Sequence, residues 1–371
     1  MQARRKSRLR SKPGTWFQQQ GVSRRAWLLS LSGLGPLRGA ELRNISFPLQ
    51  EVPGAVTPAD RFFVRDHFPE PELSLSTWRL RIEGRVARPY EMTFSDLLES
   101  PTRKAEAVLE CAGNAASGSM VGNGVWEGVP LSHLLEQAGP AADAAYILLE
   151  GADSGRLFPD FPGMPYSQLV PLGQRLQSEG LVVFKLNDRF LPASQGFPAR
   201  ALLPGWYGMA AVKWLQRVVV LSAADKPGGF YESGMDLLYV RVLRTLQGRR
   251  TAGRVAELLV KSVIAYPSDG ARLPAGNLSV WGFAWTGGSV IQAVELSTDG
   301  GGTWSPAKLH SSPKPLTWVR WSYVWVARPG EHLLMSRASD QAGRQQPLQR
   351  DPGRVDGYEL NSCAPLRCWV R

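Results

Sequence analysis

The stretch "VLECAGNAASGS", residues 108–119, contains Cys111, the first of only three cysteines in the chain. Small residues follow the thiol as far as Ser119, and they leave room for a bulky group close to the backbone. Three roles are open for this thiol: a buried filler, a nucleophile or a ligand for a metal.

Residue types alone favour a buried, structural role for Cys111. A nucleophilic cysteine needs a base such as histidine beside it, and the four histidines are scattered widely along the chain. A thiolate is a soft ligand that suits sulfur-bound metals. Free cysteine is also often buried as a small hydrophobic residue, and composition alone favours that role over metal ligation.

The other two cysteines, Cys363 and Cys368, lie near the end of the chain. They form a disulfide in an oxidising compartment or remain two free thiols. No C-x-x-C motif occurs in the sequence, so neither a c-type haem site nor a zinc ribbon is encoded.

Length and composition indicate a globular protein with room for two domains. The chain has 371 residues, of which 43% are hydrophobic and 20% are charged. The net charge of +11 is concentrated in residues 1–40, which contain nine basic residues and no acid. The remaining residues carry only +2, so we do not expect the folded body to bind nucleic acid.

The basic segment 1–40 has the features of a targeting leader. Arg24 and Arg25 stand directly before the uncharged stretch 26–37, which is too short to span a bilayer as a helix. This arrangement resembles a twin-arginine export signal and predicts a periplasmic protein; the alternative is a disordered basic tail. No later segment is apolar enough to predict a membrane span.

The many glycine, proline and tryptophan residues predict a β-rich protein with irregular connections, and residues 41–245 contain both strand-like and helix-like segments. Residues 41–75 are rich in proline and predict an extended arm packed on the body. The elements expected after the arm are a strand at 78–86, a helix at 94–100 capped by Ser95 or Asp96, a helix at 130–139, a strand at 144–153, a long loop at 154–180, a hairpin around Asn187–Asp188 and a strand at 211–222.

Residues 255–371 predict an all-β sandwich that follows a linker at 246–254. The linker is expected because the composition there becomes polar, basic and glycine-rich. Short strands and tight turns follow, with a hairpin signal at Asp299–Gly302. Val319, Trp321, Tyr323 and Trp325 fall on one face at period two, as in an antiparallel sandwich.

The wider sequence changes the assignment of Cys111. "ECAGN" resembles the cysteine motif of the sulfite oxidase family of molybdenum enzymes, which includes bacterial sulfite dehydrogenases. Four other segments resemble the family in the same order: "FFVRDHFPEP" (62–71), "WEGVPLSHLL" (126–135), "GFPARALLPGWYGMAAVKWLQRV" (196–218) and "VELSTDGGGTW" (294–304). This set implies an α+β fold, with a mixed, sulfite-oxidase-type molybdopterin domain at 41–245 followed by an all-β, immunoglobulin-like dimerisation domain.

The resemblance implies a molybdenum–molybdopterin cofactor, with Cys111 as the protein's thiolate ligand to the metal. Arg65 is then expected in the oxyanion pocket, where a guanidinium pairs with substrate oxygens. Trp126 is expected either to wall that pocket or to pack in the core. The residues implied in cofactor binding are Phe63, Val64, Arg65, Asp66, His67, Asp153, Gln195, Arg200, Ala211, Val212 and Lys213.

The sequence also departs from the family pattern at the substrate end of this site. Ala115 and Ala116 stand where the family commonly carries a second arginine, and Gln195 replaces a common histidine. Tyr231 is the predicted catalytic tyrosine, although Tyr239 also follows the "KW" segment and Asp236 is another candidate for that place.

The resemblance implies an enzyme that transfers an oxygen atom, with oxidation of sulfite to sulfate as the leading hypothesis. No haem-binding segment is present, so electrons are expected to pass to a cytochrome c subunit or carrier. A homodimer is expected from the C-terminal resemblance. Two alternatives remain: a molybdopterin reductase of sulfoxides or another oxo-substrate, and a non-catalytic binding protein that retains the fold.

Overall fold

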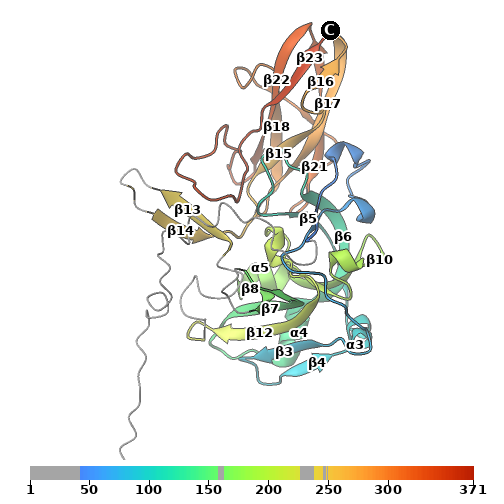
Figure 1. Ribbon diagram of the computed structural model, residues 1–371, viewed down its shortest axis with the longest axis vertical. Coiled ribbons are helices and arrows are strands. Elements are labelled where there is room, and N and C mark those ends of the chain that lie inside the picture. Colours follow the sequence, from blue (N-terminus) through green and yellow to red (C-terminus); the bar gives the residue numbers. More distant parts are fainter. Residues whose placement is uncertain (1–41, 158–162, 226–237, 245–247, 249) are drawn as a thin grey trace, which may run out of the picture.

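The computed structural model describes residues 42–157, 163–225, 238–244, 248 and 250–371. Strands dominate this part of the chain, and Figure 1 shows the C-terminal strands stacked above the sheets of the earlier residues. The α+β prediction is therefore corrected to a mostly β fold with few helices. These are α3 (Phe94–Glu99), α4 (Leu131–Ala138) and α5 (Gln174–Glu179), with 3-10 turns η1 (Leu49–Glu51), η2 (Ala59–Arg61), η3 (Ala193–Gln195) and η4 (Gly208–Ala210).

Two five-stranded sheets form most of the earlier region. The first has the order β10-β9-β6-β5, with β11 also paired to β9, and its strands are β5 (Arg103–Glu110), β6 (Val121–Pro130), β9 (Leu181–Leu186), β10 (Arg189–Phe190) and β11 (Arg200–Leu202). The second has the order β4-β3-β12-β7-β8, with strands β3 (Leu80–Gly84), β4 (Tyr90–Met92), β7 (Ala144–Gly155), β8 (Met164–Pro171) and β12 (Leu215–Ser222). Within this sheet, β12 is parallel to β3 and antiparallel to β7.

The N-terminal arm crosses these sheets and brings Arg65 to the centre of the molecule. Its short strands β1 (Asn44–Ile45) and β2 (Val64–Arg65) pair with each other, and Arg65 is the register partner of Asn44. Phe62 and Phe68, on either side of β2, are almost fully buried. Burial of these two rings fixes the arm against the body.

Local signals gave the correct position of several elements. Helix α4 begins after Pro130 and ends at Gly139, which adopts the left-handed conformation with a φ of 67°. Strands β9 and β10 form the predicted hairpin, with Asn187 and Asp188 both at positive φ. Helix α3 was also expected, but its cap is Thr93, whose side chain shares a capping box with Asp96.

Two segments that were predicted to be a loop and a linker contain regular secondary structure. The long loop expected at 154–180 contains β8 and α5, and β7 continues to Gly155. The linker expected at 246–254 contains β14 (Arg250–Arg254), which pairs with β13 (Val240–Arg244) as a hairpin. Each of these strands pairs with a neighbouring strand, β8 with β7 and β14 with β13, and that pairing is not visible in the local sequence.

Two further sheets form the C-terminal region and face each other across one hydrophobic core. One has the order β15-β17-β21-β20, with strands β15 (Lys261–Tyr266), β17 (Gly276–Trp285), β20 (Lys308–Leu309) and β21 (Val319–Ala327). The other has the order β16-β23-β22-β18-β19, with strands β16 (Ala271–Leu273), β18 (Ile291–Ser297), β19 (Ser305–Pro306), β22 (Gly330–Asp340) and β23 (Leu366–Val370). This confirms the predicted period-two face, because Val319, Trp321 and Trp325 are buried in that core.

The two regions share part of their core. The largest hydrophobic cluster includes Phe184 and Val218 of the earlier sheets together with Phe283 and Trp285 of β17. Cys363 and Cys368 are both buried, and no bond joins them in this structure. None of the helices in the described ranges is long and apolar enough to cross a membrane.

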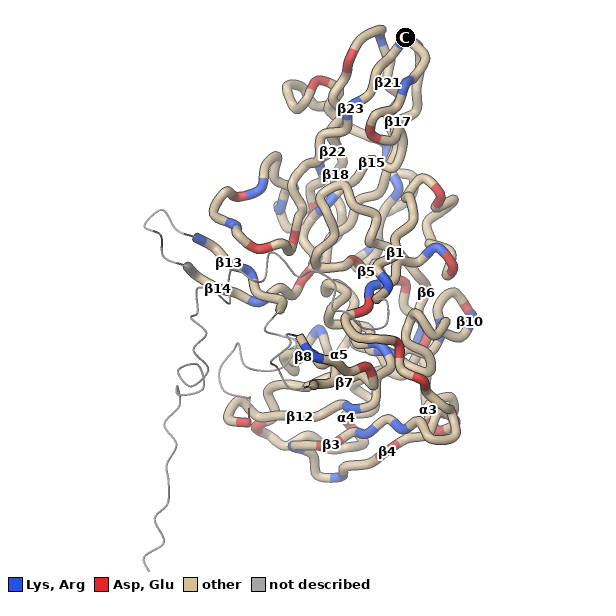
Figure 2. The backbone as a smooth tube through the Cα atoms, in the orientation of Figure 1, with Lys and Arg blue, Asp and Glu red and all other residues tan. Residues whose placement is uncertain are grey.

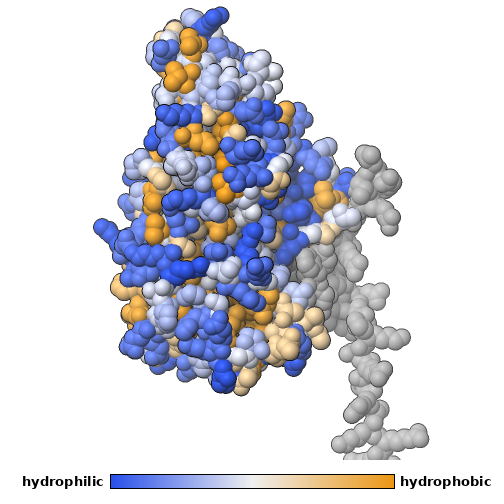
Figure 3. All heavy atoms as spheres, turned by 180° about the vertical axis from the view of Figure 1, so that it is seen from behind, coloured by the Kyte–Doolittle hydropathy of each residue, from blue (hydrophilic) through white to orange (hydrophobic). Residues whose placement is uncertain are grey.

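Charges of both signs are interspersed over the described surface (Figure 2). The reverse face is mainly hydrophilic, with hydrophobic groups scattered between the polar ones (Figure 3). Val324 and Val326 of β21 are the most exposed large hydrophobic residues among those described, each at 66%.

Candidate active site

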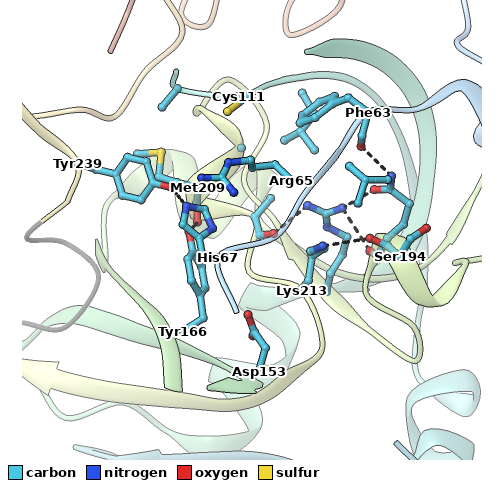
Figure 4. A pocket seen from close by; sticks show the side chains of 17 residues that line it. Phe63, Arg65, His67, Cys111, Asp153, Tyr166, Ser194, Met209, Lys213 and Tyr239 are labelled. Atoms are coloured by element: carbon cyan, nitrogen blue, oxygen red, sulfur yellow. Dashed lines mark hydrogen bonds between the residues drawn. The ribbon is translucent and has the colours of Figure 1, made fainter. Parts of the chain in front are cut away.

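A pocket opens between the arm, the end of β5 and the segment that leads into β12 (Figure 4). Its empty volume, which includes space open to solvent, is about 590 Å³. The residues that line it are Phe63, Val64, Arg65, His67, Leu109, Cys111, Ala112, Asp153, Tyr166, Ser194, Gln195, Arg200, Gly208, Met209, Ala211, Lys213 and Tyr239.

Cys111 is at one end of the pocket, on the loop between β5 and β6. Its backbone N–H donates to Met120 O at 3.0 Å, and its carbonyl accepts from Asn114 N at 2.9 Å, so the loop closes tightly around the thiol. Burial raises the pKa of the thiol, while a hydrogen bond from the Gly113 backbone and the charge of Arg65 act in the opposite direction. A neighbouring positive centre would therefore be needed to keep this sulfur as a thiolate.

Arg65 is the cation that shares this end of the pocket with Cys111. Strand β2 carries it, and Figure 4 shows its guanidinium between the sulfur of Cys111 and the ring of His67. One guanidinium nitrogen donates to the carbonyl of Asp66, which holds the side chain in place. The other donors of the fork remain available for an anionic partner.

His67 and two tyrosines form an aromatic wall next to Arg65. The His67 ring lies 4.9 Å from the Tyr166 ring and 5.7 Å from the Tyr239 ring, measured between centroids. Burial, with the charges of Arg65 and Lys213, lowers the pKa of His67 well below its ordinary value. Burial also raises the pKa of Tyr239 well above its ordinary value. The hydroxyl of Tyr239 and Nε2 of the neutral imidazole of His67 share a hydrogen bond.

Arg200 and Lys213 bring two more positive charges to the opposite end. Arg200 donates to Gln195 Oε1 and to Ala211 O, each at 2.9 Å. Lys213 donates to Ser194 O at 3.1 Å and pairs with Asp66, which is buried. Burial lowers the pKa of Arg200 to about 10 and that of Lys213 to about 8, so both stay largely cationic near neutral pH.

Asp153 lines the pocket as a buried carboxyl group without a protein partner at one oxygen. Its Oδ1 makes no hydrogen bond to any described residue, and burial raises its pKa to about 7. The Nε of Arg200 is likewise buried without a partner among the described residues. Unpaired buried polar atoms are rare in proteins, and here they indicate that a polar ligand completes the site.

The structure brings most of the predicted site residues to one pocket. The pocket brings together Phe63, Val64, Arg65, His67, Cys111, Asp153, Gln195, Arg200, Ala211 and Lys213. Asp66 does not line it but pairs with Lys213, and Val212 is buried in the core behind it. Tyr231 lies outside the described residues.

Trp126 requires a correction, since it does not line the pocket. Its side chain is fully buried, and its Nε1 donates to Ala107 O at 3.2 Å. Its ring packs edge-on against Phe62, and the guanidinium of Arg200 lies 5.5 Å from its centroid. Trp126 therefore packs beside the guanidinium of Arg200 without lining the pocket itself.

Sequence reasoning missed Tyr166, Ser194 and Met209. Tyr166 belongs to β8, within the segment that was expected to be a loop, and its hydroxyl donates to Met209 O at 2.9 Å. Met209 and Ser194 are in the 3-10 turns η4 and η3, which have no strong sequence signal. The position of Met209 inside the long apolar segment 196–218 was the only available hint.

Comparison with known proteins points to the same chemistry. Residues 67–229 match the family model described as "Oxidoreductase molybdopterin binding domain", and residues 253–355 match "Mo-co oxidoreductase dimerisation domain". The sulfite oxidase of Gallus gallus is 30% identical over 318 residues, which cover 79% of this chain and 68% of that one. The human mitochondrial sulfite oxidase is also 30% identical, and the match covers 79% of this chain and 57% of that one.

Proteins named for other activities are also similar to this chain. Nitrate reductase [NADH] 1 of Arabidopsis thaliana is 28% identical, over 86% of this chain and 38% of its own length. The solved structure of the sulfane dehydrogenase SoxCD from Paracoccus pantotrophus has 26% identity and a TM-score of 0.78, and the match covers 96% of this chain and 93% of that one. Because the resemblance extends over both regions of the fold, the chain belongs to the sulfite oxidase family of molybdenum-dependent oxidoreductases.

Proposed function

We propose that this enzyme oxidises sulfite to sulfate and passes the electrons to a cytochrome c. The observation that carries the proposal is that Cys111 and Arg65 line the same end of one pocket. A guanidinium there binds the oxygens of a small oxyanion in a fixed orientation. The sulfite oxidases among the relatives support this choice of substrate.

The chemistry of the pocket fits a molybdopterin cofactor. A thiol stands at one end and two buried cations stand at the other, with two unpaired polar atoms on the walls. Cys111 would bind the metal, and Arg200 and Lys213 would hold the phosphate by charge. Asp153 would accept hydrogen bonds from the organic part through its free Oδ1. When bound, the cofactor supplies the two-electron redox chemistry and the transfer of the oxygen atom.

The residues of the chain bind and orient the substrate and accept the protons that the reaction releases. Oxidation of one sulfite takes an oxygen atom from water and releases two protons and two electrons. Arg65 would hold the oxyanion beside Cys111, because its side chain lines the pocket at that end. The Tyr239 hydroxyl, held by its hydrogen bond with neutral His67, lines the pocket near that position. The neutral imidazole can accept a proton at the ring nitrogen that carries none.

A reductase that removes oxygen from a sulfoxide or another oxo-substrate is the second candidate. The observation that favours it is that Ala115 and Ala116 follow the cysteine loop, so Arg65 is the only arginine that lines the described pocket at the Cys111 end. A less positive pocket suits a neutral substrate better than an anion. Nitrate reductases are also among the relatives.

We propose that the protein works as a homodimer in the periplasm. The match of residues 253–355 to a dimerisation domain supports the dimer, and we propose that the two C-terminal sheets form an immunoglobulin-like sandwich. The leader 1–40, which lies outside the described residues, supports export by a twin-arginine route.

Steady-state assays of the purified holoenzyme test the proposed function. Sulfite with oxidised cytochrome c should give rapid turnover, whereas sulfoxides with a reduced dye should give little. A sulfane-sulfur compound belongs in the same panel, because the solved structure is named for that activity. Turnover of sulfoxide without any turnover of sulfite would reject the proposal in favour of the reductase.

A further inference from the structure

The residue directly before Cys111 is tied to the C-terminal sheet by a buried ion pair. Glu110 is the last residue of β5, and its side chain is only 2% exposed. Its Oε1 accepts a hydrogen bond from Lys261 Nζ at 2.8 Å, and its Oε2 accepts one from Trp285 Nε1 at 2.8 Å. The Lys261 side chain is 1% exposed, so solvent screens little of this attraction.

The same lysine also holds the far side of the cysteine loop. Lys261 Nζ donates to the carbonyl of Ala115 at 2.8 Å. Asn114 completes the network, because its Nδ2 donates to Glu110 Oε1 at 3.0 Å and its Oδ1 accepts from Met120 N at 3.0 Å. The residues on both sides of Cys111 are therefore bonded to a single ammonium group.

Both donors come from neighbouring strands of one sheet. Lys261 begins β15 and Trp285 ends β17, and the two are register partners across the sheet. A rigid sheet edge thus presents an ammonium and an indole N–H with fixed spacing. Two directional donors of this kind hold both carboxylate oxygens in one orientation, which apolar packing of the same volume does not do.

We infer that Lys261 and Trp285 are positioning residues for Cys111, so the C-terminal sheet sets the location of the thiol in the pocket. This inference rests on the proposed role of Cys111 as the ligand of the metal. A buried ion pair is weak evidence for stability, and a role in geometry explains why a lysine is kept in this place. A displaced thiol would change the metal's environment and slow turnover without altering the affinity for substrate.

The test compares Lys261→Met and Trp285→Phe holoenzymes with the wild type and with Lys185→Met. Lys185 pairs with Glu127 at 3.0 Å and does not contact the cysteine loop, so it controls for the loss of a partly buried lysine. The measurements are molybdenum content, the thiolate-to-metal absorption band, kcat and KM. Trp285→Phe removes the bond to Glu110 and leaves a small cavity but keeps the buried ion pair, so it is the milder change if Lys261→Met does not fold.

We expect Lys261→Met and Trp285→Phe to shift the absorption band and to lower kcat about 10- to 100-fold. Their KM should stay within about twofold of the wild type. Lys185→Met should leave the band and kcat unchanged. The inference is overturned if the variants fold with a normal band and normal kcat, or change them no more than Lys185→Met does. Absence of the band in the wild type would instead reject the assignment of Cys111 as the ligand.

Discussion

The ammonium of Lys261 lies 2.8 Å from the carboxylate of Glu110, and both side chains are almost completely buried. The two residues are 151 positions apart in the sequence, and Glu110 adjoins the thiol of Cys111. The contact joins the C-terminal region to the residue that precedes Cys111. The C-terminal sheets therefore form part of the structure of the active site, in addition to any role in dimerisation.

Replacing Arg65 with methionine should weaken the binding of sulfite. The guanidinium lines the pocket beside Cys111, and a charged hydrogen bond contributes about 1.5 to 3 kcal/mol. We expect KM for sulfite to rise about 10- to 150-fold, with molybdenum content unchanged. Arg61→Met, at an exposed ion pair with Glu51, is the matched control. An unchanged KM in steady-state assays would place the substrate elsewhere.

Tyr239→Phe should slow turnover while leaving the fold intact. The change removes the hydroxyl that bonds to neutral His67, and a hydrogen bond of this kind is worth about 1 to 1.5 kcal/mol. We therefore expect kcat to fall about tenfold. Tyr90→Phe removes a comparable bond to Leu134 O, away from the pocket, and should leave kcat as it is. Equal effects of the two changes on kcat would argue against a role for Tyr239.

Asp153→Asn should make the stability of the cofactor-free protein less dependent on pH. Burial raises the folded-state pKa of Asp153 to about 7, so the folded protein holds this proton more tightly than the unfolded chain does. The stability that this proton provides is complete below pH 4 and is lost as the pH rises to about 7, by at most about 4 kcal/mol. Denaturant unfolding at pH 5 and pH 7.5 measures the difference.

In the asparagine variant, the free energy of unfolding should fall less between these two pH values than in the wild type. Asp143→Asn, at an exposed carboxyl paired with Arg85, should keep the wild-type dependence. The same loss of stability in Asp153→Asn and in the wild type would show that Asp153 does not titrate in this range.

Trp126→Phe should affect stability more than catalysis. The indole is fully buried outside the pocket, and its loss removes the bond to Ala107 O and leaves a small cavity. We expect the free energy of unfolding to fall by about 1 to 3 kcal/mol. KM for sulfite should stay within about twofold of the wild type. A large rise in KM with unchanged stability would return Trp126 to the wall of the pocket.

The parts of the fold that the sequence predicted well are those that depend on neighbouring residues. Helix α4 has proline and glycine at its ends, and the hairpin at Asn187–Asp188 has a strong local turn preference. The cysteine loop was recognised because its residues form a continuous motif. Contacts between distant segments, such as Lys261 with Glu110, leave no local signal in the chain.

The errors at the site have the same origin. Tyr166 was missed because β8 is stabilised by its pairing with β7 and lies in a stretch rich in glycine and proline. The position of Trp126 was left open because a tryptophan after a glycine-rich loop suits a pocket wall and a core equally well. Only the direction of the side chain, which depends on the register of β6 with β5, decides between these two positions.

The most direct test of the whole account is the molybdenum content and sulfite-dependent cytochrome c reduction of the wild type and of Cys111→Ser, both from a host that makes the cofactor. We predict nearly one molybdenum per chain and turnover of sulfite in the wild type, with turnover lost in the variant. Full activity in Cys111→Ser, or wild-type protein without molybdenum, would contradict the account.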